Sequence, residues 1–478
     1  MHTKYLFSFL ICTLLAFSTL PAQDADQRMD LDACIQYALS NNRQIQNSRF
    51  DEYIAQARVK EIQSAGYPQI NGSADLQYFA ALPTSILPGI FNTQQELVTV
   101  DGITFPVTKL DPETFQPIPG DPVALEFGFP WQSTLGFQAN QLVFDGTFFL
   151  GLKAARAYVD LSKINTQRTQ EEIALNVSKA YYQALITQEQ INLIEANLNR
   201  ITKLFDETNI LNQNGFVEKI DVDRLRISKT NLELEKSKLE RFAALSINLL
   251  KFQMGMPITE TITMTEKAIE LTEQPDFQLD LSSFDPNNRV EYSLLKSQRA
   301  LETYNLKRYK VGYYPSLYAF GSYQWNAQRG EFNLFNTDEQ WFPIAVFGLQ
   351  LNVPIFDGFR KQAQSEQSRL TLKKIDNQMD ILQQSIQLEL TNTQTTLLNA
   401  FQNLEAYQRN AELARKVFEV SQIKYKEGVG ASLEVNEAES QLKQAESAYL
   451  SGLFEYLMAK LDWQKANGEF SKYHQEKE

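Results

Sequence analysis

Cysteine and histidine are almost absent from this 478-residue sequence. The two cysteines are Cys12 and Cys34, and the two histidines are His2 and His474. So few ligands argue against a disulfide framework and against a zinc site built from cysteine and histidine. A serine–histidine–acid triad and a phosphate-binding loop are missing as well, so we predict neither an enzyme nor a bound cofactor.

Basic residues are also fewer than acidic ones. The chain has 45 lysines and arginines against 58 aspartates and glutamates, which gives a net charge of −13. No basic stripe interrupts this acidic balance. The sequence therefore lacks the electrostatic signature of a nucleic-acid-binding protein.

Long apolar runs are confined to the N-terminus. Lys4 precedes an apolar run from Leu6 to Leu20, and Ala22 completes a plausible cleavage site, so we predict a signal peptide over residues 1–22. Beyond it, no run of about 18 apolar residues could form a membrane-spanning helix. The sequence thus predicts an exported protein, any membrane span of which must be built from strands.

Proline is missing from residues 131–256 and 355–478, whereas eight of the sixteen prolines lie in residues 83–130. Proline costs about 3 kcal/mol in a helix interior, so its absence permits very long helices. We predict long helices at 147–212 and 359–426, each roughly 100 Å long at about 1.5 Å per residue. Shorter helices are predicted at 32–66, 218–254, 284–312 and 433–466.

Apolar residues recur every seven positions in both long predicted helices. The first series is Val177, Ala184, Ile191, Leu198 and Phe205, and a shift of 213 residues gives Leu390, Leu397, Leu404, Ala411 and Phe418. A narrow apolar stripe of this kind, which repeats every seven residues, is typical of coiled-coil packing. On heptads alone, a fibrous or signalling coiled coil fits as well as any other class.

Four segments between the helices alternate apolar and polar residues, as strands with one apolar face do. They form two predicted hairpins, 68–143 and 315–355, and a tilted membrane strand needs about 9–11 such residues. Trp131, Trp325 and Trp341 lie at the turn end of these hairpins. Either an aromatic belt at a membrane interface or ordinary hairpin packing would place them there.

Four strands cannot close a barrel, and lipid does not tolerate an open sheet edge. The chain must therefore share a barrel with copies of itself, and two copies would supply eight strands where three would supply twelve. The strand count leaves both open. Residues 80–130 form a long proline-rich loop, which we expect on the outer surface, over a pore mouth or against a partner.

Three landmarks occur twice, at offsets of 247, 212 and 213 residues. They are Tyr67-Pro68 with Tyr314-Pro315, Phe144-Asp145-Gly146 with Phe356-Asp357-Gly358, and Gly215 with Gly428. Such offsets exceed solenoid periods of about 20–50 residues, so they predict a duplicated half-molecule. The predicted parts are a first repeat at 23–254, a linker at 255–283, a second repeat at 284–467 and a tail at 468–478.

In this order, the duplicated landmarks, together with Ala38-Leu39 and Asn41-Asn42, resemble the TolC family of outer-membrane efflux proteins. The resemblance covers essentially the whole mature chain. It implies an α+β membrane protein that forms a homotrimer, with a twelve-strand β-barrel in the outer-membrane lipid of a Gram-negative bacterium and a long α-helical coiled-coil barrel in the periplasm. It also implies two partners, a periplasmic adaptor (a membrane fusion protein) and an inner-membrane pump or ABC exporter.

Two acidic residues follow the second glycine turn. Glu434 and Glu437 are three residues apart, so they share one face of a helix. By spacing alone they read as a solvated first turn, where acids favour the helix dipole. The resemblance instead implies the acidic constriction of a periplasmic gate, where a ring of carboxylates favours cations.

The resemblance also places Asp221 and Tyr425 in the network that closes this gate. Gly430 stands where some family members have an arginine, which puts one closing ion pair in doubt. Two alternatives follow: the gate is held by fewer polar links, or a different residue such as Lys219 takes the place of the arginine. The two turns are expected to dock the adaptor, and their residues are Gly215, Phe216, Val217, Gly428, Val429 and Gly430.

We therefore predict a passive exit duct in the outer membrane, serving a tripartite efflux or type I secretion system. A periplasmic adaptor or coiled-coil scaffold is the alternative, although an adaptor usually carries one helical hairpin inside β domains. The transported substrate does not follow from these residues.

Overall fold

The structure is a computed structural model that describes residues 27–88, 93–268, 284–333, 336 and 338–474. The chain divides into two compact units. The helical unit comprises Met1–Gln56, Arg156–Glu302 and Leu370–Glu478, and the sheet unit comprises Ala57–Ala155 and Thr303–Arg369. Three predicted segments lie wholly or partly outside the described residues: the signal peptide 1–22, residues 269–283 of the linker and residues 475–478 of the tail.

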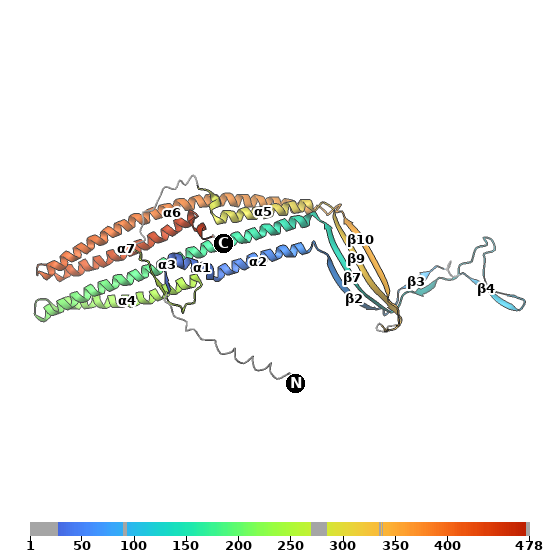
Figure 1. Cartoon of the computed structure of the whole chain (residues 1–478), viewed down its shortest axis with the longest axis horizontal. Helices are drawn as coiled ribbons and strands as arrows, with labels where there is room; N and C mark the ends of the chain where they lie inside the picture. Colours follow the sequence, from blue (N-terminus) through green and yellow to red (C-terminus); the bar gives the residue numbers. More distant parts are fainter. Residues whose placement is uncertain (1–26, 89–92, 269–283, 334–335, 337, 475–478) are drawn as a thin grey trace, which may run out of the picture. The chain divides into compact units, whose positions relative to one another are not determined.

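Two helices are far longer than the others, α3 (Gly146–Gln213) and α6 (Arg360–Lys426). Each is followed by a shorter helix, α4 (Lys219–Met254) after α3 and α7 (Ser432–Ala466) after α6. In the helical unit α4 lies along α3, and α7 lies along α6 (Figure 1). None of the four contains a proline, which is why each can run without interruption.

A large apolar core lies in the helical unit, where α1, α3, α6 and α7 contribute side chains. Tyr181 of α3 and Tyr456 of α7 are fully buried, and so is Leu453. Heptad residues on the two long helices are buried with them, including Val177 and Leu390. Burial of each large apolar side chain stabilises the fold by about 1.5–3 kcal/mol, so this core holds the helices together.

The helix predicted at 32–66 is wrong in one respect, because it breaks at Asn42 into α1 (Leu31–Asn41) and α2 (Arg43–Ser64). The backbone of Asn42 is extended (ψ 129°). Its side-chain amide donates to the carbonyl of Gln253 at 2.8 Å, and its side-chain oxygen accepts from the amide of Gln44 at 2.8 Å. Asn42 therefore caps the second helix and ties it to the end of α4.

The helix predicted at 284–312 also starts late. A 3-10 turn, η4 (Pro286–Asn288), precedes α5 (Val290–Val311). Asp285 accepts from the amide of Asn287 at 2.9 Å, which favours the tight turn over a continuous helix. The predicted linker contains a strand as well, because β8 (Ile262–Met264) pairs in parallel with β1 (Gln27–Met29).

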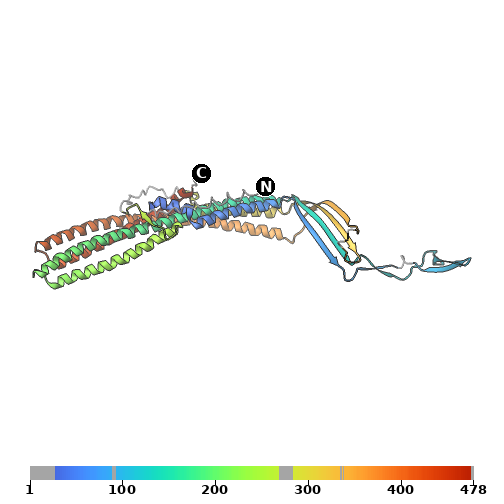
Figure 2. The ribbon, with the colours of Figure 1, turned by 60° about the horizontal axis from the view of Figure 1, so that its bottom comes forward.

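Four strands of the sheet unit form one antiparallel sheet in the order β10-β9-β7-β2 (Figure 2). They are β2 (Gln69–Tyr78), β7 (Trp131–Phe144), β9 (Ser316–Arg329) and β10 (Phe342–Asn352). One row across the sheet consists of Ala74, Leu135, Trp325 and Pro343, and the next row consists of Asp75, Thr134, Asn326 and Phe342. Since successive rows point to opposite faces, the register groups apolar residues on one face as the alternation predicted.

The predicted loop at 80–130 is more ordered than expected. It contains two small antiparallel pairs, β3 (Thr84–Leu87) with β6 (Val123–Glu126) and β4 (Gln95–Val100) with β5 (Ile103–Thr108). Asp101 and Gly102 both have positive φ in the β4–β5 turn, the conformation that two-residue hairpins favour. Proline density identified the interruption of the main sheet but not these local pairings. Residues 89–92 lie outside the described residues.

Candidate functional site

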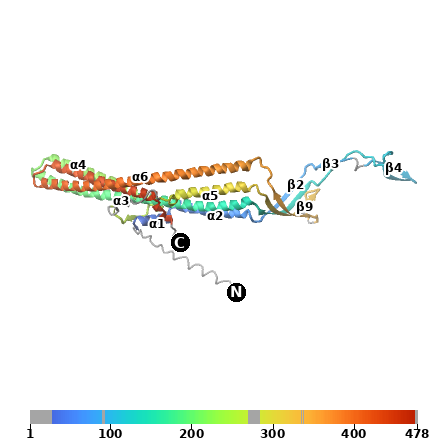
Figure 3. The same ribbon diagram turned by 90° about the horizontal axis from the view of Figure 1, so that it is seen from above.

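Both helical turns lie at the same end of the helical unit (Figure 3). Gly215 and Gly428 have φ of +80° and +75°, a conformation that glycine adopts without strain. The amide of Phe216 donates to the carbonyl of Leu211 at 2.9 Å, and the amide of Val429 donates to that of Lys424 at 3.0 Å. Donors and acceptors are both offset by 213 residues, so the two turns repeat the same hydrogen bond.

The turns present apolar side chains to the outside at matching positions. Phe216 is 77% exposed and Val429 is 79% exposed. Ile220 and Leu433, again 213 residues apart, are exposed as well. Val217, by contrast, is half-buried, and its carbonyl accepts from the Asn212 side chain at 2.8 Å. This end of the helical unit therefore carries an exposed apolar surface, here called the turn surface, made of Phe216, Ile220, Val429 and Leu433.

Glu434 and Glu437 lie in the first turns of α7, and both are exposed. Val435 and Ala438 on the same turns are buried. The carboxylates therefore occupy the helix face that points away from the chain's own core, as their spacing predicted.

Asp221 and Tyr425 are not joined by a hydrogen bond within one chain. Asp221 instead lies 3.7 Å from the guanidinium of Arg224, one turn along α4. The hydroxyl of Tyr425 is buried and makes no hydrogen bond with any described residue. The expected partnership of these two residues is therefore not formed inside a single chain.

Gly430 sits where there is little room for a side chain. A Cβ at this position would lie 3.0 Å from the Cβ of Lys424 and 3.1 Å from the amide nitrogen of Tyr425. The backbone conformation of this turn therefore disfavours an arginine at position 430. A different ion pair joins α6 to α3 nearby, from Lys426 to Glu207 at 3.3 Å. Sequence reasoning missed it because the two residues are 219 positions apart.

The predicted aromatic belt lies on the sheet unit. Trp131 opens β7 and contacts Tyr78 and Phe332 with ring centroids 4.7 and 4.8 Å apart. Trp325 lies within β9 and contacts Tyr323 at 4.7 Å, and Trp341 immediately precedes β10. Trp131 thus joins rings from both hairpins, whereas Trp325 and Tyr323 form a separate pair within β9.

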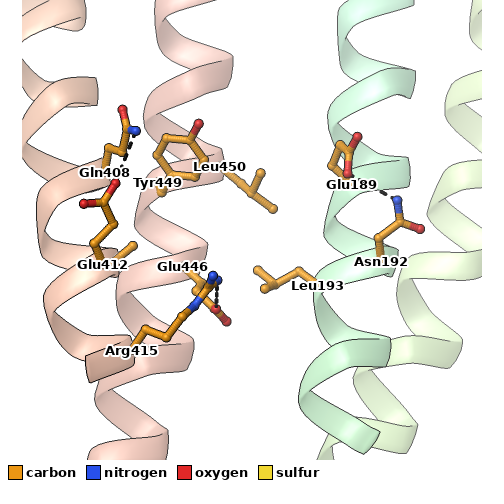
Figure 4. A pocket seen from close by; sticks show the side chains of 10 residues that line it. Glu189, Asn192, Leu193, Gln408, Glu412, Arg415, Glu446, Tyr449 and Leu450 are labelled. Carbon is orange, nitrogen blue, oxygen red and sulfur yellow. Dashed lines mark hydrogen bonds and ion pairs between the residues drawn. The ribbon is translucent and has the colours of Figure 1, made fainter. Parts of the chain in front are cut away.

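A cavity of about 290 Å³ lies between α3 on one side and α6 and α7 on the other (Figure 4). Polar side chains reach it from all three helices: Glu189 and Asn192 from α3, Glu412 and Arg415 from α6, and Glu446 from α7. Sequence reasoning missed it because these residues come together only in the folded bundle.

Glu446 is the most deeply buried charge at this cavity, with 5% exposure. Its carboxylate accepts from Arg415 at 2.9 Å and from Arg200 of α3 at 3.0 Å. About two turns before it, burial raises the pKa of Glu439, and the Glu446 carboxylate acts in the same direction against the opposing effect of Arg200 and Lys443. This part of the bundle interior is therefore charged.

Two negative findings apply to the described residues. None of the described helices is both long and apolar enough to cross a membrane. The same ranges hold no group of three histidine, cysteine, aspartate or glutamate side chains placed to bind a metal ion.

The sequence matches the family model described as outer membrane efflux protein over residues 291–468. Nodulation protein T of Rhizobium leguminosarum bv. trifolii is 23% identical over 311 residues, which cover 64% of this chain and 63% of that protein. The match thus spans just under two thirds of that relative. Outer membrane protein TolC of Vibrio cholerae is 17% identical over 336 residues, covering 70% of this chain and 76% of the relative.

Solved structures resemble the chain over more of its length. CusC matches with a TM-score of 0.70 at 14% identity, covering 92% of this chain and 93% of that one. The open state of the MtrE channel of Neisseria gonorrhoeae gives 0.68 at 16% identity, covering 92% and 88%. VceC of Vibrio cholerae gives 0.65 at 14% identity, covering 92% and 96%. At such low identities the likeness shows a shared fold.

Proposed function

Because this chain belongs to the outer membrane efflux protein family, as a TolC-like member, we propose that it is the exit channel of a tripartite efflux or type I secretion system. The protein resides in the outer membrane of a Gram-negative cell and extends into the periplasm. In the proposed role it passes substrates from the periplasm, or from an inner-membrane transporter, to the exterior.

The four-stranded sheet is the observation that carries this proposal. Its register gathers apolar residues on one face over rows such as Ala74, Leu135 and Trp325, and the other face is mainly polar on β2, β7 and β9. On β10 that second face carries the apolar residues Phe342, Ile344 and Val346. Its strands are 10 to 14 residues long, enough to cross a bilayer when tilted. A sheet with a lipid-facing and a water-facing side is what a channel wall requires.

The two outer strands, β2 and β10, have no further neighbour among the described strands of this sheet. Open edges are not tolerated in lipid, so copies of the chain must complete the sheet. We propose a homotrimer, in which three copies form a twelve-strand barrel and the long helices of three copies form a coiled-coil barrel. The two halves of each chain, 23–254 and 284–467, would contribute one hairpin and one long helix each.

In the helical unit, the proposed gate uses Glu434 and Glu437. Both are exposed on the face of α7 that points away from the chain's own core, so three copies would bring six carboxylates together. Such a ring attracts cations and keeps a constriction hydrated. Asp221 and Tyr425 would contribute to closure through contacts in the trimer, since they are not hydrogen-bonded to each other within one chain and the Tyr425 hydroxyl has no partner among the described residues.

The turn surface is the proposed docking site for a periplasmic adaptor. Its exposed apolar residues, Phe216 and Val429 foremost, are costly to leave in water unless a partner covers them. Gly215, Val217, Gly428 and Gly430 would shape the backbone of this surface. The adaptor would connect the channel to an inner-membrane pump or ABC exporter, which supplies the energy.

Reconstitution into planar lipid bilayers tests the proposal. We expect the purified protein to conduct ions, to require detergent for extraction and to run as a heat-sensitive trimer. Glu434→Ala/Glu437→Ala should reduce block by divalent cations and cation preference, whereas Glu455→Ala, an exposed acid on the same helix, should not. Release by carbonate without detergent, together with no conductance, would favour a periplasmic adaptor or scaffold instead.

A further inference from the structure

One buried carboxylate connects three helices of the helical unit. Glu446 on α7 accepts from Arg200 on α3 and from Arg415 on α6, at 3.0 and 2.9 Å, and is only 5% exposed. Charge-assisted hydrogen bonds of this kind are about twice as strong as neutral ones. Glu446 therefore fixes the position of α7 relative to both neighbours.

The fourth helix, α4, is linked to α7 about one turn before Glu446. Lys443, three residues before Glu446, pairs with Glu235 on α4. Lys236, next to Glu235, pairs with Glu195 on α3 at 2.8 Å. We call the set of Arg200, Glu235, Arg415, Lys443 and Glu446 the charged layer. It links all four helices that lead to the two turns.

Apolar packing beside the charged layer is interrupted by unpaired polar groups. Asn197 of α3 is fully buried, and neither atom of its side-chain amide has a hydrogen-bond partner among the described residues. One carboxylate oxygen of Glu439 on α7 is buried in the same way. Unpaired buried groups cost free energy in the interior of the bundle, so the helix register there depends more heavily on the bond between Arg200 and Glu446.

The charged layer is not part of the duplicated scaffold. The 213-residue offset that relates the two turns places Leu413 at the position of Arg200 and Glu233 at the position of Glu446. Leu413 is 61% exposed and Glu233 is exposed too. The arginine–glutamate bond therefore belongs to one particular seam, between α3 and α7, and the fold can be built without it.

We infer that Glu446 is a register lock between the α3–α4 pair and the α6–α7 pair, and that its bond to Arg200 holds the proposed gate closed. It lies 12 residues beyond Glu434, or about 18 Å along α7 at about 1.5 Å per residue. A shift of α7 against α3 at the lock moves the gate carboxylates by a similar amount. The inference rests on the proposed channel function, and Glu446 acts through helix position without touching the transported substrate.

Single-channel recording on Glu446→Gln tests the lock. This variant keeps the side-chain shape but removes the charge, and it should raise the open probability about tenfold, in the usual range for coupling between distant sites. The open-state conductance should stay the same, because the pore lining is unchanged. Glu455→Gln, the same substitution at an exposed position of α7, should behave as wild type.

Two further variants test whether the bond between Arg200 and Glu446 causes the effect. Arg200→Gln should reproduce the effect of Glu446→Gln, and the double variant should add nothing, since both remove one interaction. Arg415 is 61% exposed at its side chain, so Arg415→Gln leaves the interior intact and should give a smaller change in the same direction. It keeps the test available if Glu446→Gln fails to fold.

A distance measurement separates failure of the lock from failure of the channel function. Spin labels at Asn214→Cys and Glu427→Cys report the separation of the two turns, whether or not the protein conducts. The lock predicts a longer or broader distance distribution in Glu446→Gln than in wild type or Glu455→Gln. An unchanged distribution would overturn the lock. A changed distribution in a protein that never conducts supports the lock and overturns the channel.

Discussion

Gly452 decides how closely α6 and α7 pack, and it allows a quantitative test. A Cβ added at Gly452 would lie 2.6 Å from Cδ2 and 3.2 Å from Cε2 of the Tyr407 ring, closer than side chains tolerate. Overpacking of this kind costs about 1–3 kcal/mol. Alanine is favoured over glycine in a helix by about 1 kcal/mol, which acts in the opposite direction. Gly452→Ala should therefore be neutral to destabilising by about 2 kcal/mol.

The coupling to Tyr407 is the decisive quantity. In a Tyr407→Ala background the clash is gone, so Gly452→Ala should stabilise by about 1 kcal/mol through helix propensity alone. The two backgrounds should thus differ by about 1–3 kcal/mol, measured from guanidinium unfolding in detergent followed by tryptophan fluorescence. Gly151 of α3 is the matched control, because a Cβ there meets no atom within 4 Å. If Gly452→Ala stabilises the wild type as much as Gly151→Ala does, the close-packing argument is refuted.

Three further results are expected. Burial raises the pKa of the Cys34 thiol to about 12, so iodoacetamide at pH 8 should leave it unmodified in the native protein and label it after denaturation, as read by mass spectrometry. Burial also raises the pKa of the Glu439 carboxyl group. The folded state therefore holds the Glu439 proton more tightly than the unfolded state. The stability that Glu439 contributes through this proton falls as the pH rises above the unfolded pKa of about 4.3. Glu439→Gln should consequently be more stable than wild type at neutral pH, with a difference in thermal midpoint that shrinks on acidification, and a pH-independent difference would contradict the assignment. Gly428→Ala should cost about 1 kcal/mol through its positive φ alone, and Gly428→Asn less, in the same unfolding assay; equal effects of both would show that the backbone conformation does not set the cost.

Local patterns in the sequence predicted the elements that depend on local chemistry. The absence of proline and the heptads led to α3 and α6, and period-two alternation led to the strands that the register pairs. The break at Asn42 was not predictable from its neighbours, because its side chain bonds to Gln253, 211 residues away. The pairing of β4 with β5 was in principle readable from Asp101-Gly102 between two β-branched segments. High proline content obscured that signal.

The candidate site also contains some features that follow from the local sequence and others that depend on residues far apart in the chain. The glycine turns and the shared face of Glu434 and Glu437 follow from spacing within a few residues. Glu446 looks like any other acid on α7 until folding places Arg200 beside it, from 246 residues earlier in the chain. Gly430 illustrates a third case, in which a departure from a family pattern has a steric reason visible only in the folded turn.

Comparison of the two repeats also indicates which helix would cover the exposed apolar side of α6. On α3, the residues Asn197, Arg200, Ile201 and Leu204 are buried or half-buried, and Ile201 and Leu204 share an apolar cluster with residues of α7. Their counterparts at an offset of 213 are Asn410, Leu413, Ala414 and Val417, which line a groove on the side of α6. Leu413 and Val417 are left exposed there. The first repeat thus finds its cover in α7 of the same chain, whereas no helix among the described residues covers this groove of the second repeat in the same way. In the proposed trimer α4 of the next copy, the counterpart of α7, would take that place, so the helices and the open strand edges independently call for the same closure by copies of the chain.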